Sequence, residues 1–259
     1  MRNVWQELSG LLLPAACAGC GRPRTELCAA CGAALLAGPA RRVLPSPTPP
    51  GLPAVWAAAP YENAVRAVLL AHKERGALGL AGALGRALAG CVRAGTGQRG
   101  GAATPGGAGH PRAATPLLLV PVPSARSATA ARGHDPVRRI AVTAARELRR
   151  AGLPARVLPA LRQRRAVADQ SGLGARQRRV NLAGALELTA AGERLLRRGL
   201  LRHDRVVLVD DLLTTGSTLA EAARAVEEGC RADRESFVHG GCRAAVVAAS
   251  PSAFEINRN

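Results

Sequence analysis

Short, unbroken apolar runs occur at residues 117–120, 206–209 and 244–248. Apolar runs of this length without alternation are typical of strands that are buried on both faces. Such strands belong to a parallel sheet with helices on either side of it. We therefore predict an α/β fold with a parallel, doubly wound sheet.

Helical patterns lie between these runs, with favourable residues at their ends. Asn63 precedes a helical pattern that ends at Gly76, and Asp135 with Pro136 opens another that ends at Gly152. These residue types favour a helix start, and glycine favours its end. The expected apolar faces are Val65, Val68, Leu69 and His72 in the first helix, and Val137, Ile140, Ala141, Ala144 and Leu148 in the second.

Composition divides the chain into segments. We predict a cysteine-bearing segment at 1–36, a proline-rich linker at 37–54, a main α/β domain at 55–250 and a tail at 251–259. Residues 94–116 are rich in Gly, Ala, Thr and Pro without periodicity. This stretch has nothing to bury, so we expect a flexible insertion within the main domain.

A group of acidic and small polar residues follows the apolar run at 206–209. Asp210 and Asp211 come first, and after Leu212-Leu213 the chain continues as Thr214, Thr215, Gly216, Ser217 and Thr218. Thr218 and Glu221 have the spacing of a capping box, and the helical pattern behind them ends at Gly229. The sequence therefore predicts a strand, an acidic turn, a small polar loop and a helix.

That order of elements favours a phosphate site. Backbone N–H groups at a helix start, with hydroxyl groups and a glycine, can surround a phosphate. Two carboxylates beside a phosphate are useful only if they bind another part of the ligand, such as sugar hydroxyls or a metal. The carboxyl end of a strand is also where open α/β sheets bind ligands. The alternative is a buried strand followed by an ordinary capped helix.

Basic residues follow the run at 117–120 and the first helix. Arg126 and Arg132 could bind a pyrophosphate, because guanidinium groups match phosphate oxygens, or they could form a solvated basic face. Lys73 is the only lysine in the chain. It is expected either to bind the same ligand or to interact with the end of its helix.

Residues 162–181 carry two clusters of arginines. They are Arg162, Arg164 and Arg165, followed by Arg176, Arg178 and Arg179. Such a segment is either a mobile solvated loop or a lid that closes over a pyrophosphate and excludes water.

Two Cys-x-x-Cys-Gly sequences lie near the start of the chain. They contain Cys17 with Cys20 and Cys28 with Cys31. Two such turns can direct four thiolates at one ion, which is typical of structural zinc. A redox pair is the alternative, although a single Cys-x-x-Cys would suffice for it. We assign no role to Cys91, Cys230 and Cys242.

Composition limits the possible partners. The chain has 36 basic and 18 acidic residues, a net charge of +18, and only 2% aromatic residues. The charge favours phosphate-bearing partners, or it reflects a GC-biased genome that favours arginine codons. The lack of aromatics argues against binding bases by stacking.

The odd number of cysteines and the absence of an apolar run of roughly 20 residues predict a cytoplasmic protein without a membrane span. Residues 8–16 resemble a signal segment but are interrupted by Pro14.

Together these motifs resemble a known family. Residues 206–219 are similar to the fingerprint of type I phosphoribosyltransferases. They combine with the cysteine pairs, His72-Lys73-Glu74-Arg75-Gly76, Pro121-Val122-Pro123, Arg132-Gly133, residues 170–173 and Arg178-x-x-Asn181. This combination resembles the ComF competence proteins. This chain has His134-Asp135 where family members often have Phe-Asn, and Val167 where they often have Thr.

The resemblance implies a ligand and a function. It implies that phosphoribosyl pyrophosphate, or a related sugar phosphate, binds with Mg²⁺. Asp210 and Asp211 would hold the ribose hydroxyls and the loop at 214–218 would hold the 5-phosphate. We expect either a phosphoribosyl transfer activity or a non-enzymatic adaptor in DNA uptake, which would bind single-stranded DNA and a competence helicase or recombination mediator. A regulator that senses phosphoribosyl pyrophosphate is a further alternative. No residue stands out as a general base.

Overall fold

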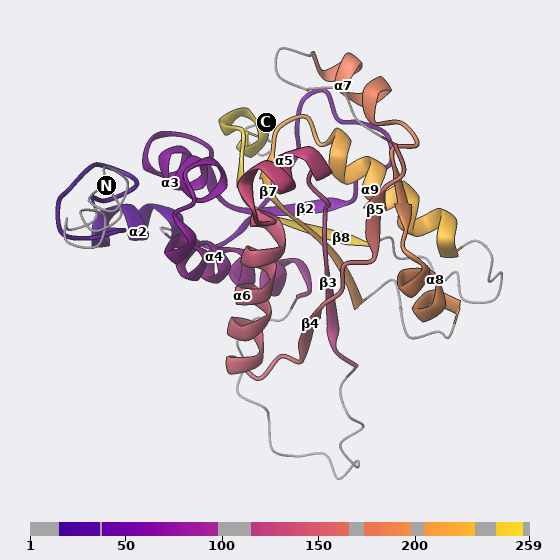
Figure 1. Cartoon of the computed structure of the whole chain (residues 1–259), viewed down its shortest axis with the longest axis horizontal. Helices are drawn as coiled ribbons and strands as arrows, with labels where there is room; N and C mark the ends of the chain where they lie inside the picture. Colours follow the sequence, from indigo (N-terminus) through magenta and orange to yellow (C-terminus); the bar gives the residue numbers. More distant parts are fainter. Residues whose placement is uncertain are drawn as a thin grey trace, which may run out of the picture.

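Six strands form the main sheet of the protein (Figure 1). The computed structural model describes residues 16–36, 38–97, 115–165, 174–197, 205–230 and 242–255. The strands are β1 (Arg41–Val43), β2 (Ala54–Pro60), β3 (Leu117–Pro121), β4 (Ala155–Val157), β7 (Val206–Leu213) and β8 (Arg243–Ala249). Their order in space is β1-β2-β8-β7-β3-β4. β1 is antiparallel to β2, and all other neighbours are parallel.

The sheet confirms the α/β class and a mostly parallel arrangement, with two corrections. The three apolar runs form β3, β7 and β8 as predicted. However, β7 continues to Leu213, so Asp210 and Asp211 lie within a strand rather than in a turn. In addition, β1 lies inside the stretch that was expected to be a linker, where it extends the sheet by pairing with β2.

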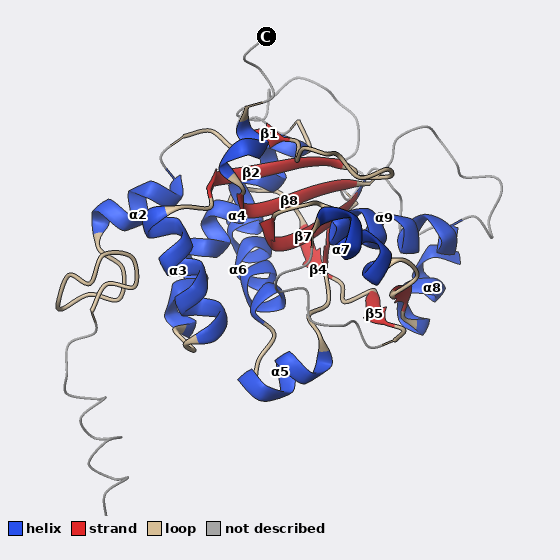
Figure 2. Cartoon of the chain, turned by 90° about the horizontal axis from the view of Figure 1, so that it is seen from above, coloured by secondary structure: helices blue, strands red, loops and turns tan. Residues whose placement is uncertain are grey.

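Helices cover both faces of this sheet (Figure 2). On one face lie α4 (Ala81–Gly95) and α6 (Pro136–Arg150), and α3 (Asn63–Glu74) adds its buried side chains to the same core cluster, which includes Val207 and Val209. On the other face lies α9 (Ser217–Cys230), which packs on Val206 and Leu208. Neighbouring residues of a strand point to opposite faces, so an unbroken apolar run is needed where both faces are covered.

The helices that the sequence predicted are present, but Asn63 does not cap the first one: it lies inside α3, and no side chain caps that helix start. Asp135 precedes α6, and its carboxylate accepts a hydrogen bond from the N–H of Arg138 (3.0 Å). The expected apolar faces of α3 and α6 are buried. Gly76 and Gly152 follow the helix ends with φ of 67° and 78°, a conformation that glycine adopts without strain. α9 runs to Cys230, one residue beyond the expected end.

The direction of the connections reverses between β3 and β7. From β3 the chain passes through α5 (Arg126–Arg132) and α6 to β4, at one edge of the sheet. From β7 it passes through α9 to β8, in the opposite direction. Right-handed crossovers in opposite directions put their helices on opposite faces, as observed. Ligands of open α/β sheets bind at the carboxyl ends of the strands at such a reversal.

A smaller unit is attached to α9. It contains the antiparallel strands β5 (Leu161–Gln163) and β6 (Leu186–Leu188), with α7 (Ala175–Leu182) and α8 (Ala190–Arg197). The carboxylate of Glu221 on α9 accepts a hydrogen bond from the N–H of Leu186 (3.0 Å). Arg224 donates to the carbonyl of Leu186 (3.0 Å), so two neighbouring side chains of α9 hold the backbone of β6.

The ends of the described chain pack on the main domain. α2 (Ala29–Leu36) buries Leu35 against the core cluster that contains α3 and α4. Residues 251–254, expected to be part of a tail, form a 3₁₀ helix whose Ala253 carbonyl accepts from the N–H of Leu44 (2.9 Å). Of the stretch at 94–116, residues 94 and 95 belong to α4, and residues 98–114 lie outside the described residues. No helix of the described residues is long and apolar enough to cross a membrane.

Candidate functional site

The ends of β3 and β7 meet at the reversal of the sheet. The N–H of Val122, just after β3, donates to the carbonyl of Val209 in β7 (2.9 Å). The residues after β3 and those after β7 therefore lie at the same edge. This arrangement brings Arg132 and the α5–α6 corner toward the acids of β7, whereas the sequence places them far apart.

The loop after β7 has the geometry expected of an anion site. Gly216 has φ of 75°, and α9 begins at the next residue. The Thr215 hydroxyl lies 3.1 Å from the Ser217 hydroxyl and accepts from the N–H of Ser217 (3.4 Å). Within the described residues, the backbone N–H groups of Thr214, Thr215, Gly216 and Thr218 donate no hydrogen bond. N–H groups without an acceptor at the start of a helix favour binding of an anion.

The loop is supported from behind by the segment after β1. A Cβ on Gly216 would lie 3.1 Å from the Cδ atoms of Leu52 and 3.2 Å from the Cγ of Pro45. A side chain at position 216 would force these two residues to shift, and it would also be strained at the positive φ of Gly216. Ser250 holds the other side, since its N–H donates to the carbonyl of Leu213 (2.9 Å).

The expected capping box does not form. Glu221 is 6% exposed and points to Leu186 and Arg224 instead of the start of α9. Burial opposes its charge, but the bonds from Arg224 and Leu186 outweigh this and lower the pKa of Glu221. The first N–H groups of α9 are therefore left to the loop and to any ligand.

The two acids of β7 have different environments. Asp211 is 6% exposed, and its Oδ2 lies 2.9 Å from Nζ of Lys73 at the end of α3. Asp210 is half-buried, and its Oδ1 accepts from the N–H of Asp211 (2.9 Å). Burial and the Asp211 carboxylate raise the pKa of Asp210 well above its usual range, while Lys73 opposes the shift. Burial lowers the pKa of Lys73, but Asp211 and Asp210 outweigh this and raise it.

Of the arginines that the sequence singled out, Arg132 and Arg178 lie near the loop or the acids of β7. Arg132 lies near this group, and its Nη1 pairs with Glu74 on α3 (3.2 Å). Arg178 of α7 reaches the loop, where Nη1 lies 3.5 Å from the Thr214 hydroxyl. The side chain of Arg126 and residues 170–173 lie outside what the structure describes.

Other arginines of the expected lid have local partners. Arg162 pairs with Glu187 on β6 (2.9 Å), and Arg164 lies 3.9 Å from the same side chain. Arg165 donates to the carbonyls of Asn181 (2.8 Å) and Ala183 (3.0 Å). These contacts hold the small unit together, and Arg178 is the arginine that contacts the loop in the described part of this unit.

Two histidines beside the acids were not predicted as site residues. His72 is 1% exposed, and its ring centroid lies 6.2 Å from that of His134 at the α5–α6 corner. Burial and the nearby His134 lower the pKa of His72 to about 4, so the ring is uncharged at neutral pH. In the sequence, the position of His72 on an apolar helix face indicated a core residue. Only the structure shows that His134, from a distant part of the chain, lies beside it.

The four N-terminal cysteines form the arrangement that the sequence predicted. The sulfur atoms of Cys17, Cys20, Cys28 and Cys31 all lie within 4.8 Å of one another, and three of the residues are buried. Cys20 Sγ and Cys28 Sγ are 3.6 Å apart, too far for a disulfide bond of about 2.05 Å. Tetrahedral zinc–sulfur bonds of about 2.3 Å place sulfurs roughly 3.8 Å apart. The donor set and spacing therefore fit a metal ion such as zinc.

The two cysteine turns differ in detail. Gly21 follows the first pair with φ of 76°, as a tight turn requires, but Gly32 lies within α2. Burial opposes ionisation of Cys17, yet backbone N–H groups of Cys28, Cys20 and Gly19 lower its pKa to about 6. A thiolate at neutral pH is the form that binds a metal.

The sequence was also compared with known proteins. No protein family model matches the chain, and no curated protein matches it significantly.

Proposed function

We propose that this chain binds a ribose phosphate, with phosphoribosyl pyrophosphate as the expected ligand, and acts as a phosphoribosyltransferase. One observation carries the proposal. An acid pair and a hydroxyl-rich loop with N–H groups that donate to no described residue follow one another at the reversal of a parallel sheet. A phosphate fits the loop, and sugar hydroxyls fit the carboxylates.

The proposed roles follow from position. The N–H groups of Thr214, Thr215, Gly216 and Thr218, with the hydroxyl groups of this loop, would bind the 5-phosphate. Asp210 and Asp211 would accept hydrogen bonds from the ribose hydroxyls, and Asp211 must then loosen its contact with Lys73. Lys73 and Arg132 would turn toward a pyrophosphate, and Arg178 would close over the loop. Bound Mg²⁺ would neutralise charge on the pyrophosphate.

The cysteine site has a structural role in this proposal, with zinc as its metal. Ala64 in the first turn of α3 packs against the cysteines, and the last turn of α3 carries Lys73. Zinc would therefore fix the helix that positions the lysine of the site. Elemental analysis of protein purified without chelator should find one zinc per chain, and Cys28→Ser should release it. Stoichiometric iron, or four reactive thiols without metal, would contradict this assignment.

The acid pair provides the test of ribose binding. Charge-assisted hydrogen bonds contribute about 1.5 to 3 kcal/mol each, so Asp210→Asn with Asp211→Asn should weaken phosphoribosyl pyrophosphate binding at least roughly tenfold. Calorimetry in the presence of Mg²⁺ measures the affinity. Unchanged affinity would refute the proposal. Because Asp211 is buried against Lys73, thermal unfolding of the same variant must show that it folds.

A matched control separates this effect from charge. Glu227→Gln with Glu228→Gln removes the same two charges in the last turn of α9, at the opposite end of that helix from the loop. It should leave the affinity for phosphoribosyl pyrophosphate within about twofold.

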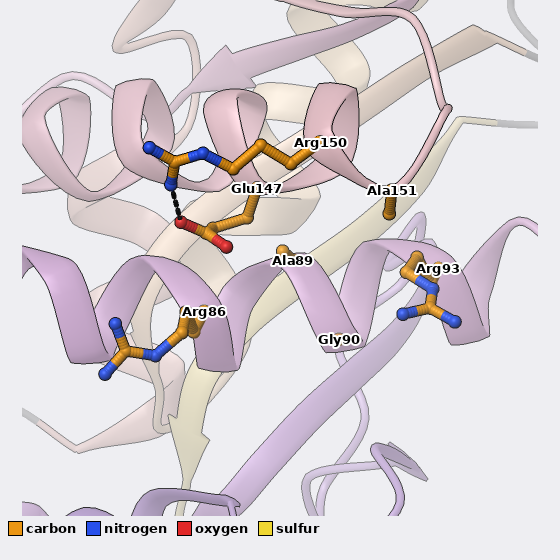
Figure 3. A pocket seen from close by; sticks show the side chains of 7 residues that line it. All are labelled: Arg86, Ala89, Gly90, Arg93, Glu147, Arg150 and Ala151. Carbon is orange, nitrogen blue, oxygen red and sulfur yellow. Dashed lines mark hydrogen bonds and ion pairs between the residues drawn. The ribbon is translucent and has the colours of Figure 1, made fainter. Parts of the chain in front are cut away.

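A second candidate function is an adaptor that binds single-stranded DNA, and the charge distribution favours it. A cleft of about 380 Å³ between α4 and α6 is bordered by Arg86, Arg93 and Arg150, with Glu147 as its single acid (Figure 3). Arg150 pairs with Glu147, and Arg86 and Arg93 extend from α4. Guanidinium groups around a cleft fit the phosphates of a nucleic acid.

DNA could also bind with its phosphates at the loop after β7. In that case the variant Asp210→Asn with Asp211→Asn should bind DNA more tightly, because two negative charges beside the phosphate are lost. The same variant should bind phosphoribosyl pyrophosphate more weakly.

A further inference from the structure

His72 is a buried histidine with both of its ring nitrogens unpaired. It lies on the face of α3 that packs on the core, and neither Nδ1 nor Nε2 has a hydrogen-bond partner. Buried polar atoms nearly always have partners, so such an atom needs an explanation. The structure thus places a buried imidazole with an available lone pair in the last turn of α3, beside the acids of β7.

His134 meets it from a different segment and has a fixed orientation. Its Nδ1 lies 2.9 Å from the carbonyl of Arg132, which can only accept, so Nδ1 carries the proton. Nε2 is then the nitrogen with the lone pair, and it is buried without a partner. Histidines that bind metals are commonly oriented in this way, with one N–H bonded to a backbone carbonyl and the other nitrogen free.

The separation of the rings fits one ion between them. With metal–nitrogen bonds of about 2.0 Å, two imidazoles on one ion have centroids roughly 5 to 6 Å apart. The observed separation of 6.2 Å is slightly longer than this range, so the rings must approach each other for one ion to bind both. Closer approach of the α5–α6 corner to the end of α3 would bring the rings to the separation that one ion requires.

The charges around the two histidines affect how tightly the pair can bind a metal ion. Lys73 and Arg132 are paired with Asp211 and Glu74, and Arg139 also lies close enough to oppose a positive charge on His72. Asp210 is the remaining acid of the group. Among the described residues, only the four cysteines bring three or more ligand atoms within 4.8 Å. A two-histidine site therefore binds a metal more weakly than the cysteine site.

We propose that His72 and His134 together bind a divalent transition-metal ion, distinct from the ion of the four cysteines. Imidazole nitrogens favour Zn²⁺, Co²⁺, Ni²⁺ or Cu²⁺ over Mg²⁺ and Ca²⁺. The ion would join the end of α3 to the α5–α6 corner, with water completing its coordination. This site is independent of the ribose phosphate proposal, because it requires no sugar ligand.

Co²⁺ is the probe for the test, with the full chain in its zinc-loaded form. Nuclear magnetic resonance should show strong paramagnetic shifts for the ring protons of two of the five histidines. Calorimetry should give one Co²⁺ site, and both His134→Phe and His72→Phe should weaken it at least tenfold. The control His110→Phe should leave it unchanged. Mg²⁺ at the same concentration should produce no shift of the two resonances.

Optical spectra separate the two metal sites. Co²⁺ that replaces zinc at the cysteines produces a strong sulfur-to-metal absorption band in the near ultraviolet, and nitrogen ligands do not. Paramagnetic shifts without this band support the histidine site. The proposal fails if no histidine resonance shifts, or if Co²⁺ binds only together with the sulfur band. It also fails if His134→Phe binds Co²⁺ as tightly as the unchanged protein does. His134 lies in a loop, so this variant decides the test even if His72→Phe does not fold.

Discussion

Gly19 shows how one backbone position determines the geometry of the cysteine site. A Cβ at this position would lie 2.6 Å from the sulfur of Cys31 and 2.9 Å from its Cβ. Real Cβ atoms do not approach other atoms so closely, so the sulfur would have to move away from the other three. We predict that Gly19→Ala weakens metal binding, because a bond of about 2.3 Å tolerates little displacement. Competition with a coloured zinc chelator measures the loss.

Gly32 supplies the matched control in the same segment. A Cβ there meets Leu27 at 3.7 Å, an ordinary contact, and the residue lies inside α2. Alanine is also the better helix former by roughly 1 kcal/mol. Gly32→Ala should therefore retain the metal, and equal metal loss in both variants would show that the clash at Gly19 is not the cause.

At the scale of elements, the contact between α9 and β6 depends on Glu221. Its carboxylate binds the N–H of Leu186 and the guanidinium of Arg224, while Arg224 also binds the carbonyl of Leu186. Loss of one partner leaves buried groups unsatisfied, which costs about 1 to 3 kcal/mol. We predict that Glu221→Ala lowers the free energy of unfolding by this amount and increases hydrogen exchange in β6. Exchange that increases equally across the main sheet would contradict a local role.

The same contact predicts a dependence on pH. The pKa of Glu221 is lower in the folded protein than its ordinary value of 4.5. The charged carboxylate therefore makes its full contribution to the stability of the fold above pH 4.5. This contribution is lost as the pH falls below 4.5 through the folded pKa. The stability difference between the unchanged protein and Glu221→Gln should therefore shrink in acid. A constant difference across this range in urea unfolding experiments would exclude the charged contact.

Elements with local signals were predictable, whereas those that depend on distant partners were not. α6 has its cap at Asp135 and a continuous apolar face, and both features lie within the helix itself. β1, β5 and β6 are three residues long and exist only because another strand pairs with them. Glu221 has capping-box spacing, but the backbone of Leu186, far away in sequence, binds it instead.

The sequence proposed single residues for the candidate site, but it did not predict their contacts. Asp211 and Lys73 were each predicted, and their 2.9 Å contact arises only when α3 packs beside β7. The histidine pair was missed for the same reason, since His72 by itself follows the apolar pattern of its helix. Motifs thus identify single residues, and the topology of the sheet determines which of them meet.

At the scale of the whole molecule, the net charge of +18 predicts steep salt dependence. Arginines without neighbouring aromatics bind phosphates but do not stack on bases, so single-stranded DNA should bind weakly and without sequence preference. Changing Arg86, Arg93 and Arg150 to Gln should reduce the slope of log affinity against log salt by roughly 2, at about 0.7 per phosphate. Fluorescence anisotropy at several salt concentrations measures the slope.

The control changes three arginines that lie outside the cleft and have partners in the protein, as Arg150 of the cleft also has in Glu147. Arg149 donates to the carbonyl of Ala155, and Arg162 and Arg164 lie next to Glu187. Gln at these positions should change the slope less than the variant of the cleft does. An affinity that hardly changes between low and physiological salt would rule out this kind of binding altogether.

The position of β8 in the sheet has a consequence for biosynthesis. β8 follows all the other strands in the described sequence, yet it lies between β2 and β7. Until residues 243–249 are available, the chain can form at most two separate part-sheets, β1–β2 and β7–β3–β4, each with an open edge. Such edges are templates for misassembly, and contacts between distant segments form slowly. Because Ser250 holds Leu213, the loop after β7 acquires its final support only when translation has passed β8.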